Sequence, residues 1–365
     1  MLNSVYIHIP FCNNICSYCD FCKNFYNEKI VLKYLEELKK EIQGNYKNES
    51  LSTIYIGGGT PSCLSNVALD KLFDITNSFF LDMVYEFTFE CNYEDITEEL
   101  LIKLKKNKIN RISIGLQTFN SKYSTFLERK INKKKMFEKI NLTKKYFDNI
   151  NVDLIYAMQN ETIEELKNDI HEFIKLDVPH ISTYALMLEE HTKLKNNNVK
   201  EVSDELQSKM YYMIIKELKN SGYLHYEISN FSKDGYESKH NLTYWNNNRY
   251  YGFGAGASGF IGNTRYNNTK SIFNYTKGKY RFYEEKLSDR ELISDEIMLN
   301  LRKTSGINKK QFKEKYNKDL NELFCYDTLI QDGFIHEIND SIFISDEYLF
   351  VCNEIILRFI ETKRI

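Results

Sequence analysis

Residues 6–22 have the sequence Tyr6-Ile7-His8-Ile9-Pro10-Phe11-Cys12-Asn13-Asn14-Ile15-Cys16-Ser17-Tyr18-Cys19-Asp20-Phe21-Cys22, in which Cys12, Cys16 and Cys19 have the spacing C-x3-C-x2-C. The apolar run at residues 5–9 predicts a buried strand, and the cysteines stand on the loop that leaves it. Thiolates on one loop can hold an iron–sulfur cluster, although a fully protein-ligated four-iron cluster takes four of them. A set of three would leave one iron open to a further ligand, as catalytic metal sites do.

The same cysteines have two other interpretations, a zinc knot and a redox pair. Zinc motifs usually carry two C-x2-C pairs far apart, and this sequence has no second pair elsewhere. Cys22 is either a spare thiol in the loop or an occasional cluster contact, and the first is favoured. The remaining cysteines are scattered and are expected to be small buried apolar side chains: Cys63, Cys91, Cys325 and Cys352.

Length and charge limit the function classes. A chain of 365 residues predicts two or three domains with a large core. Its 49 basic and 51 acidic residues nearly balance, which argues against nucleic acid or an anionic membrane surface as a partner. No apolar run reaches membrane-spanning length, and eight cysteines without a signal peptide indicate reduced thiols. We therefore expect a cytoplasmic protein that makes at most a transient contact with a membrane.

Strand and helix patterns alternate six times through the first two thirds of the chain. The predicted strands are residues 5–9, 53–56, 85–90, 111–115, 150–156 and 180–186. The predicted helices are residues 28–43, 69–80, 97–106, a segment reaching 147, 162–176 and 203–221. This order is typical of an α/β fold with a parallel sheet, here a partial TIM-type barrel, whose chemistry lies at the carboxyl ends of the strands.

The pattern changes after residue 228. Residues 229–268 are rich in Asn, Tyr and Gly and predict a long irregular segment of functional importance. Helices are then predicted at 289–302, 309–316 and 321–331, a strand pair at 334–344 and a last helix at 348–360. The organisation that follows is a barrel domain at 1–230, a connecting segment at 231–285 and a winged-helix-like domain at 286–365.

Polar groups and glycines stand where the predicted strands end. The second strand ends in Gly57-Gly58-Gly59-Thr60-Pro61, and glycines let a ligand approach the backbone and leave N–H groups free to donate. Glu90 ends the third strand, Gln117 follows the fourth and Asp153 lies in the fifth. Taken singly, each is more simply a solvated strand end or a cap. Together they predict one ligand cleft at the upper edge of the barrel.

These motifs resemble the radical S-adenosylmethionine (SAM) superfamily, in particular its coproporphyrinogen oxidase branch. The branch pattern Arg-x-Ser-x-Gly-x-Gln is matched at residues 111–117, and its arginine twelve residues later by Arg129. Its Asp-Leu-Ile-Tyr and Tyr-Ala-Leu strings are matched at residues 153–156 and 184–186. The chain departs from the branch at Tyr93, where a proline is usual, and at residues 157–159, which replace Gly-Leu-Pro.

The resemblance implies a set of roles. Cys12, Cys16 and Cys19 would each bind one iron, and the open iron would take the amino and carboxylate groups of SAM. An acidic side chain can hold the ribose hydroxyls of SAM, and an arginine can pair with its carboxylate. The implied SAM-binding residues are Tyr6, Tyr18, Gly58, Gly59, Thr60, Glu90, Gln117, Arg129, Asp153 and Ala185.

The string His240-Asn241-Leu242-Thr243-Tyr244-Trp245 resembles the mark of the HemW-type heme chaperone branch. This implies that His240 ligates heme iron, and that heme passes to an acceptor protein that the sequence does not name. Taken from the residues alone, a His and a Trp that fasten a long loop to the barrel are favoured. The alternative function is an oxygen-independent coproporphyrinogen III oxidase, which decarboxylates its substrate by radical SAM chemistry, and a zinc-binding scaffold is a further rival.

Overall fold

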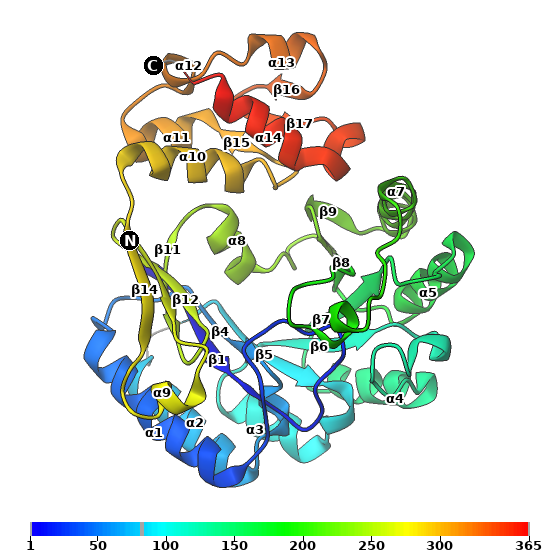
Figure 1. The fold of residues 1–365 in the computed structure, drawn as a ribbon, viewed down its shortest axis with the longest axis vertical. Coiled ribbons are helices and arrows are strands. Elements are labelled where there is room, and N and C mark those ends of the chain that lie inside the picture. Colours follow the sequence, from blue (N-terminus) through cyan, green and yellow to red (C-terminus); the bar gives the residue numbers. More distant parts are fainter. Residues whose placement is uncertain (1, 81–83, 364–365) are drawn as a thin grey trace.

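The computed structural model describes residues 2–80 and 84–363, and its centre is a curved sheet of twelve strands (Figure 1). The strand order is β14-β13-β12-β11-β1-β4-β5-β6-β7-β8-β10-β9. The run from β11 to β8 is parallel, and antiparallel strands extend the sheet on both sides of it. The parallel strands are β1 (Leu2–Ile9), β4 (Thr53–Gly58), β5 (Glu86–Asn92), β6 (Arg111–Gln117), β7 (Asn149–Tyr156), β8 (His180–Ala185) and β11 (Arg249–Phe253). The α/β partial barrel expected from the sequence is confirmed.

Helices lie around the outside of the curved sheet (Figure 1). They are α1 (Glu28–Asn45), α2 (Asn66–Phe79), α3 (Glu98–Lys106), α4 (Lys133–Lys144), α5 (Ile163–Lys175) and α7 (Asp204–Asn220). Each begins after a side chain that accepts a hydrogen bond from the third helical residue, which satisfies a backbone donor at the helix start: Asn27, Ser65, Thr97, Asn132, Thr162 and Ser203. The predicted helix before residue 147 is shorter than expected, since α4 begins only at Lys133.

The strand residues alternate between the helices and the barrel interior. In β6, Ile112, Ile114 and Leu116 are fully buried under the outer helices. The residues between them, from Arg111 to Gln117, line the interior instead. A parallel strand covered by helices is usually apolar on both faces, so the polar inner face marks an interior that holds something other than packed side chains.

The prediction of an irregular segment at residues 229–268 is wrong. The segment forms β10 (Asn230–Ser232), α8 (Lys239–Trp245), β11, β12 (Ser258–Ile261) and β13 (Thr264–Asn268). Strand β11 pairs in parallel with β1, with Tyr6 opposite Gly252. A Cβ on Gly252 would lie 1.8 Å from the Ser258 carbonyl oxygen, so only glycine lets β11 and β12 approach this closely. The high content of Asn, Tyr and Gly predicts a loop, because composition carries no information on which strands pair in the folded chain.

Helix α8 closes the amino-terminal end of the barrel, which we call the floor. The carboxylate of Glu86, the first residue of β5, accepts hydrogen bonds from the backbone N–H groups of Lys239 (3.0 Å) and His240 (2.9 Å). A negative charge at a helix amino terminus is favourable because the helix dipole is positive there. The hydroxyls of Ser4 in β1 and Thr243 in α8 are 2.8 Å apart. The helix is thus fastened to the first residues of the central strands.

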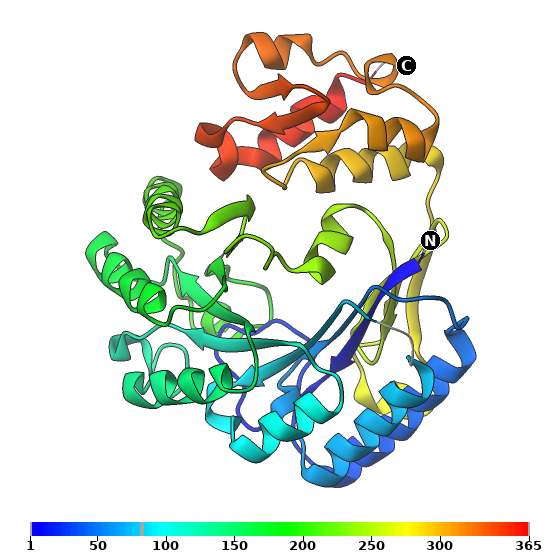
Figure 2. The ribbon, with the colours of Figure 1, turned by 180° about the vertical axis from the view of Figure 1, so that it is seen from behind.

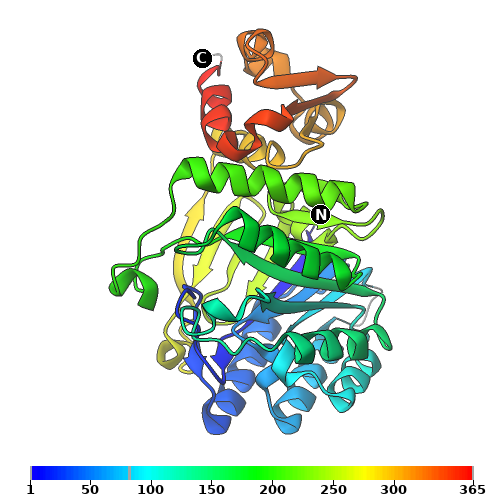
Figure 3. The same cartoon turned by 90° about the vertical axis from the view of Figure 1, so that its right-hand side faces the viewer.

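The C-terminal region lies over the floor and over α7 (Figures 2 and 3). Its elements are α10 (Asp289–Asn300), β15 (Ile307–Asn308), α11 (Lys309–Tyr316), α12 (Leu320–Leu323), α13 (Asp327–Gln331), β16 (Ile335–Ile338), β17 (Ser341–Ile344) and α14 (Cys352–Glu361). The three strands form a small antiparallel sheet, which confirms the mainly helical winged type. The predicted helix at 321–331 is two short helices. The proposed domain limits at 230 and 285 stay a prediction.

The remaining elements are short. They are β2 (Phe11–Cys12), β3 (Asn24–Phe25), α6 (Lys193–Asn196), β9 (Leu224–Glu227), α9 (Ile272–Tyr275) and β14 (Arg281–Lys286). Four 3-10 helices occupy Pro61–Cys63, Tyr93–Asp95, Ser121–Tyr123 and Asp346–Val351 within the described residues. Strands β2 and β3 pair across the base of the cysteine loop, Phe11 opposite Asn24, and so hold its two ends together.

Candidate functional site

A cavity of about 520 Å³ runs from the cysteine loop into the barrel interior. It opens at the carboxyl ends of the strands, where the sequence placed the site. Most of the predicted site residues line it: Cys12, Cys16, Tyr18, Cys19, Gly58, Gly59, Thr60, Glu90, Gln117, Arg129, Asp153 and Ala185. Two predicted residues, Tyr6 and His240, are not among the residues that line it.

The three cysteines of the motif are free thiols at one end of this cavity. The Thr60 hydroxyl donates to Cys12 Sγ at 3.4 Å. Burial raises the pKa of the Cys12 thiol to about 11, and the nearby Cys19 and Cys16 sulfurs raise it further against the lowering by Thr60. Sulfurs that raise one another's pKa in a buried site ionise together only when a cation compensates them. The donor set therefore suits a metal centre.

The arrangement of possible ligands bears on the choice between a single metal ion and a cluster. Within the described part of the chain, no three His, Cys, Asp or Glu side chains are arranged to hold one metal ion. A four-iron cluster needs a wider arrangement, because each thiolate binds a different iron. Cys12, Cys16 and Cys19 line one cavity, where each sulfur could bind a different iron.

Cys22 faces away from the cavity. Its Sγ donates to the Lys270 carbonyl at 3.3 Å, and its side chain packs against Gly256, where an added Cβ would lie 2.4 Å from Cys22 Cβ. Its own carbonyl accepts from His8 Nε2 at 2.8 Å in the tautomer that protonates this nitrogen. Cys22 therefore fastens the end of the cysteine loop to the sheet in this structure.

The glycine turn lies where the sequence predicts it, but its backbone N–H groups already donate hydrogen bonds to other groups of the protein. A Cβ on Gly59 would lie 2.8 Å from backbone atoms of Ile9 and Phe11, so only glycine lets the turn pass this close. However, the Gly58 N–H donates to Glu90, the Gly59 N–H to the Ile9 carbonyl and the Thr60 N–H to the Phe11 carbonyl. The expectation of free N–H donors is wrong. Such a turn can bind an ammonium group only through carbonyl oxygens.

Glu90 is held rigidly at the inner wall. The Tyr55 hydroxyl donates to one carboxylate oxygen at 2.6 Å, and the Gly58 N–H donates to the other at 2.9 Å. A Cβ on Gly57 would lie 2.5 Å from the Glu90 carboxyl carbon, which explains a second glycine of the turn. Burial raises the pKa of Glu90 to about 7, against the lowering by its two donors. A ligand with hydroxyl or amino donors would favour the ionised form.

Gln117 and Arg129 meet at the end of β6. Gln117 has φ 71°, a left-handed backbone that costs about 1–3 kcal/mol for a non-glycine residue and is typical of functional positions. The β6–β7 register shifts between Gly115 and Gln117. Arg129 donates to the Asn92 side chain (2.7 Å) and to the Gly115 carbonyl, and its Nε lacks a partner among the described residues. Arg129 thus keeps a donor available for an anion.

The other predicted residues differ in position. Asp153 accepts from the Asn151 amide at 2.8 Å, and burial raises its pKa. Ala185 ends β8 and lines the cavity with only a methyl group, which takes up little of its space. Tyr18 packs against the apolar cluster that holds the cavity edge, formed by Tyr123, Leu127, Ile155, Met158, Leu186 and Leu194. Tyr6 lies behind the glycine turn, and its hydroxyl is 2.9 Å from His8 Nδ1.

His240, the implied heme ligand, does not present an exposed imidazole. Its exposed fraction is 1 %, since it lies on α8 and points into the barrel floor. One ring nitrogen is 2.7 Å from the Thr53 hydroxyl and the other 2.8 Å from the Tyr244 hydroxyl. Burial lowers the pKa of His240 to about 3, and the Arg111 charge adds to this. The imidazole is neutral, and both nitrogens are engaged.

Several cavity residues were missed in the sequence. They share the inner face of the strands below the predicted rim: Tyr55, Arg111, Ser113, Asn151, Ser182 and Tyr184, with Asn241 from α8. The sequence pattern that indicates them is a non-apolar residue at every second position of a strand, as at Arg111, Ser113, Gly115 and Gln117. A parallel strand with such an alternation must face a polar interior.

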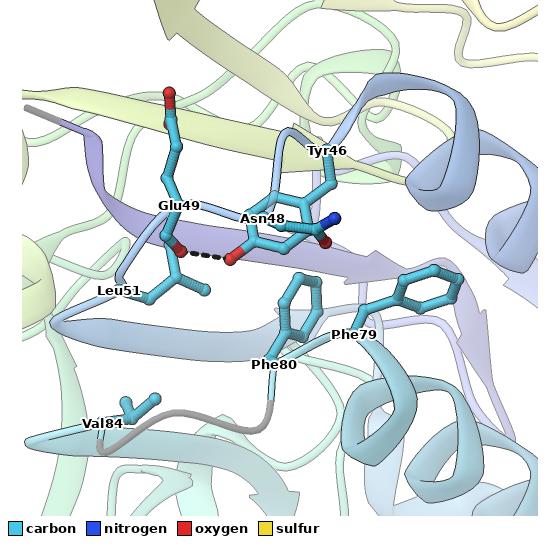
Figure 4. Close-up of a pocket in the computed structure, with 7 residues that line it drawn as sticks. All are labelled: Tyr46, Asn48, Glu49, Leu51, Phe79, Phe80 and Val84. Atoms are coloured by element: carbon cyan, nitrogen blue, oxygen red, sulfur yellow. Dashed lines mark hydrogen bonds between the residues drawn. The ribbon is translucent and has the colours of Figure 1, made fainter.

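A smaller hollow of about 80 Å³ lies beyond the end of α1 (Figure 4). The Tyr46 hydroxyl donates to the Glu49 carbonyl, and the Tyr46 ring meets Phe80 edge-on at 5.0 Å (Figure 4). The wall is completed by Asn48, Leu51, Phe79 and Val84. None of these belongs to the cavity described above. We attribute the hollow to the packing of a loop against two helices.

Comparison with known proteins agrees with this geometry. Residues 6–173 match the Radical SAM superfamily, and residues 287–350 match the HemN C-terminal domain. Heme chaperone HemW of Lactococcus lactis subsp. lactis is 38 % identical over 98 % of this chain and 97 % of its own. The chain belongs to the HemW family of the radical SAM superfamily. Heme chaperone HemW of Bacillus subtilis is 37 % identical over 98 % of this chain and 99 % of its own.

The fold is shared with a solved structure outside the chaperones. Coproporphyrinogen III oxidase (HemN) from Escherichia coli superposes with a TM-score of 0.84 over 98 % of this chain and 90 % of that chain, at 19 % identity. At this identity the likeness concerns the fold alone, which HemW family members and the oxidase therefore have in common. In the part of the chain that the structure describes, no helix is long and apolar enough to cross a membrane.

Proposed function

We propose that this protein is a heme chaperone that binds heme, a [4Fe-4S] cluster and SAM, and delivers the heme to an acceptor protein. The observation that carries the proposal is the convergence of three cysteines, the glycine turn and the rim residues on one cavity. The relatives that share nearly the whole chain are named heme chaperones, which supports heme as the cargo. The eight free cysteines fit a reducing, cytoplasmic location.

Cys12, Cys16 and Cys19 would hold the cluster, which can supply electrons to a ligand on its open iron. Lys23 lines the same end of the cavity and lowers the pKa of Cys12 and Cys19 by its charge, so it would offset part of the negative charge of the bound thiolates. SAM would lie between the cluster and the strand ends. Asp153 and Glu90 would accept hydrogen bonds from its hydroxyl and amino groups, and Arg129 would donate to its carboxylate.

We retain His240 as the proposed heme ligand. Because it is buried, its present hydrogen bonds must break before it can bind iron. The imidazole must give up its contacts to Thr53 and Tyr244 before a nitrogen can reach iron. Its neutral form suits ligation, because iron competes with a proton for the same lone pair. Heme would then lie at the barrel floor, beside α8. Two further buried histidines differ from it: both ring nitrogens of His180 are hydrogen-bonded, whereas neither ring nitrogen of His225 has a hydrogen-bond partner among the described residues.

The rival function is oxidative decarboxylation of coproporphyrinogen III. The protein should be purified without oxygen, loaded with iron and sulfide, and incubated with SAM, a reductant and coproporphyrinogen III. Product analysis by chromatography should show no protoporphyrinogen IX above a cluster-free control made by Cys16→Ala. Steady formation of that product by the wild type, absent from the control, would replace the chaperone proposal by the oxidase.

A further inference from the structure

The loop that carries the three cysteines is hydrogen-bonded to a second segment of the chain, residues 126–129. Three backbone carbonyls of this segment accept from the loop, at 2.6, 3.3 and 2.6 Å: Phe126 from Ser17 Oγ, Leu127 from the Ser17 N–H and Glu128 from Asn14 Nδ2. Both donor residues lie between Cys12 and Cys19 in the sequence. The position of the sulfurs therefore depends on this segment.

Arg129 ends the segment, and its side chain reaches one of the sulfurs. Its Nη1 donates to Cys16 Sγ at 4.0 Å, a long hydrogen bond to sulfur. Its Nη2 donates to Asn92 Oδ1 at 2.7 Å and to the Gly115 carbonyl, which takes up both Nη2 hydrogens. A bidentate pair with a carboxylate uses an Nη2 hydrogen together with Nε or Nη1. Arg129 can therefore give the SAM carboxylate single hydrogen bonds only, whereas its contact with the sulfur exists before SAM binds.

Tyr93 holds the same arginine in place. Its ring is fully buried, and the guanidinium carbon of Arg129 lies 5.9 Å from the ring centroid, within the range of about 6 Å at which a cation is attracted to an aromatic face. Its hydroxyl donates at 2.8 Å to the carbonyl of Lys130, the residue after Arg129. Tyr93 is not among the residues that line the cavity. It is also a position at which the chain departs from the branch pattern.

A cation beside Cys16 has a definite effect once a cluster is bound. Three thiolates on an oxidised four-iron core leave a net negative charge, and reduction adds another. A hydrogen bond to a sulfur and a nearby positive charge both favour the reduced form. Burial raises the pKa values of Asp95 and Asp153, and the Arg129 charge partly lowers them, so these carboxyls offset some of that charge. The hydrogen bonds of Arg129 go elsewhere, however, and one of them goes to Cys16.

We propose that Arg129 is a positioning residue for the cluster, which donates to the Cys16 thiolate of the loaded protein and raises the reduction potential of the cluster. Tyr93 supports it by holding the guanidinium against the sulfur. This inference rests on the proposed function, since it takes the cluster as bound. It gives Arg129 a role in the protein without SAM, whereas pairing with the SAM carboxylate gives it a role only in the complex.

The midpoint potential of the cluster, measured without SAM by a redox titration followed by electron paramagnetic resonance, tests the proposal. Arg129→Gln should reduce the ratio of reduced to oxidised cluster at the wild-type midpoint about tenfold, which is a fall of about 59 mV for one electron. Arg129→Lys should show a smaller fall, because lysine retains the charge but not the planar group. Tyr93→Leu should also lower the potential, whereas Tyr93→Phe keeps the ring and should retain the wild-type value.

Controls separate this effect from damage to the fold. Arg265→Gln removes an arginine that pairs with Asp295 at 2.8 Å outside the cavity, and it should leave the potential unchanged. Melting temperature and iron and sulfide content are measured for every variant. If Arg129→Gln does not hold a full cluster, Arg129→Lys and the comparison of Tyr93→Leu with Tyr93→Phe decide the matter.

The outcomes distinguish this inference from the proposed function. A wild-type potential in the loaded Arg129 and Tyr93→Leu variants overturns the inference, and weaker SAM binding in those same Arg129 variants would then assign the arginine to the SAM carboxylate alone. An equal fall in Tyr93→Phe and Tyr93→Leu overturns the role of the ring. A wild type that holds no cluster after anaerobic loading overturns the proposed function itself, and this inference with it.

Discussion

The cysteine loop, residues 12–22, contains four cysteines, of which we propose three as cluster ligands and Cys22 as a non-ligand. Alanine at Cys12, Cys16 or Cys19 should abolish the cluster, because each sulfur lines the cavity and would bind its own iron. Cys22→Ala is the matched variant, since Cys22 Sγ donates to the Lys270 carbonyl outside the cavity. Iron and sulfide analysis after anaerobic loading should show full content for Cys22→Ala. Loss of iron in that variant would make Cys22 a ligand.

His240 allows a second test at the same scale. If it ligates heme, His240→Ala should weaken hemin binding or change the absorption spectrum of the bound heme. Thr53→Val is the matched variant, because it keeps the imidazole and removes one of its two hydrogen-bond partners. It should leave heme affinity unchanged or raise it, since one competing contact is gone. A parallel loss in both variants would indicate that α8 packing, and not iron ligation, is what His240 contributes.

The residues at the strand ends could be predicted from the sequence, because motif spacing and strand periodicity show where each strand ends. Glu90, Gln117 and Asp153 were placed correctly at the cavity for this reason. The burial of His240 could not be predicted in the same way. It depends on β11 pairing with β1, more than two hundred residues away, and on Glu86 fixing the start of α8. Tertiary pairing overrides composition in such segments.

At the scale of elements, the turn that joins β7 to α5 contains a buried carboxyl. Burial raises the pKa of Glu161 from its usual 4.5 to about 8, although the Met158 N–H donates to it at 3.0 Å. Because this folded-state pKa lies above the unfolded value, the folded chain binds more protons between these pH values. The contribution of Glu161 to the free energy of unfolding should therefore fall as pH rises from about 4.5 to about 8, and level off above it.

Glu161→Gln should remove this contribution, at most about 5 kcal/mol for a shift of about 3.5 pKa units at about 1.4 kcal/mol per unit. Urea unfolding across this pH range measures it. In the variant, Asp169 and Glu90, whose pKa values burial raises to about 6 and about 7, still contribute slopes of the same sign, and His240, whose pKa burial lowers to about 3, contributes a slope of the opposite sign, so the difference between variant and wild type is the quantity to compare. Glu205→Gln, at an exposed site in the first turn of α7, is the control and should keep the wild-type slope. An identical slope in Glu161→Gln and the wild type would contradict this assignment.

At the scale of the whole molecule, the C-terminal region is fastened to the end of α8. Lys315 Nζ donates to the Asn246 carbonyl (2.9 Å) and to the Asn247 carbonyl (3.1 Å), and it pairs with Glu296 at 2.7 Å. Lys303 also donates to Asn246. Motion of this region therefore acts on the helix that carries His240.

Lys315→Met should keep the aliphatic packing and remove these contacts. Hydrogen exchange should become faster at residues 239–247, because local opening follows the loss of tertiary contacts. Lys313→Met is the control, since Lys313 pairs with Asp319 within the C-terminal region. Exchange rates at 239–247 that match between Lys315→Met and the wild type would show that the C-terminal region does not hold α8.

The central claim is that this chain binds heme as cargo. The most direct measurement is an anaerobic titration of hemin into the cluster-loaded wild type, followed by absorbance and by heme analysis of the gel-filtered complex. We predict a shifted Soret band that saturates at about one heme per chain, as expected for a single specific site. Hemin that leaves the protein completely on gel filtration, or that binds without saturation, would contradict the claim.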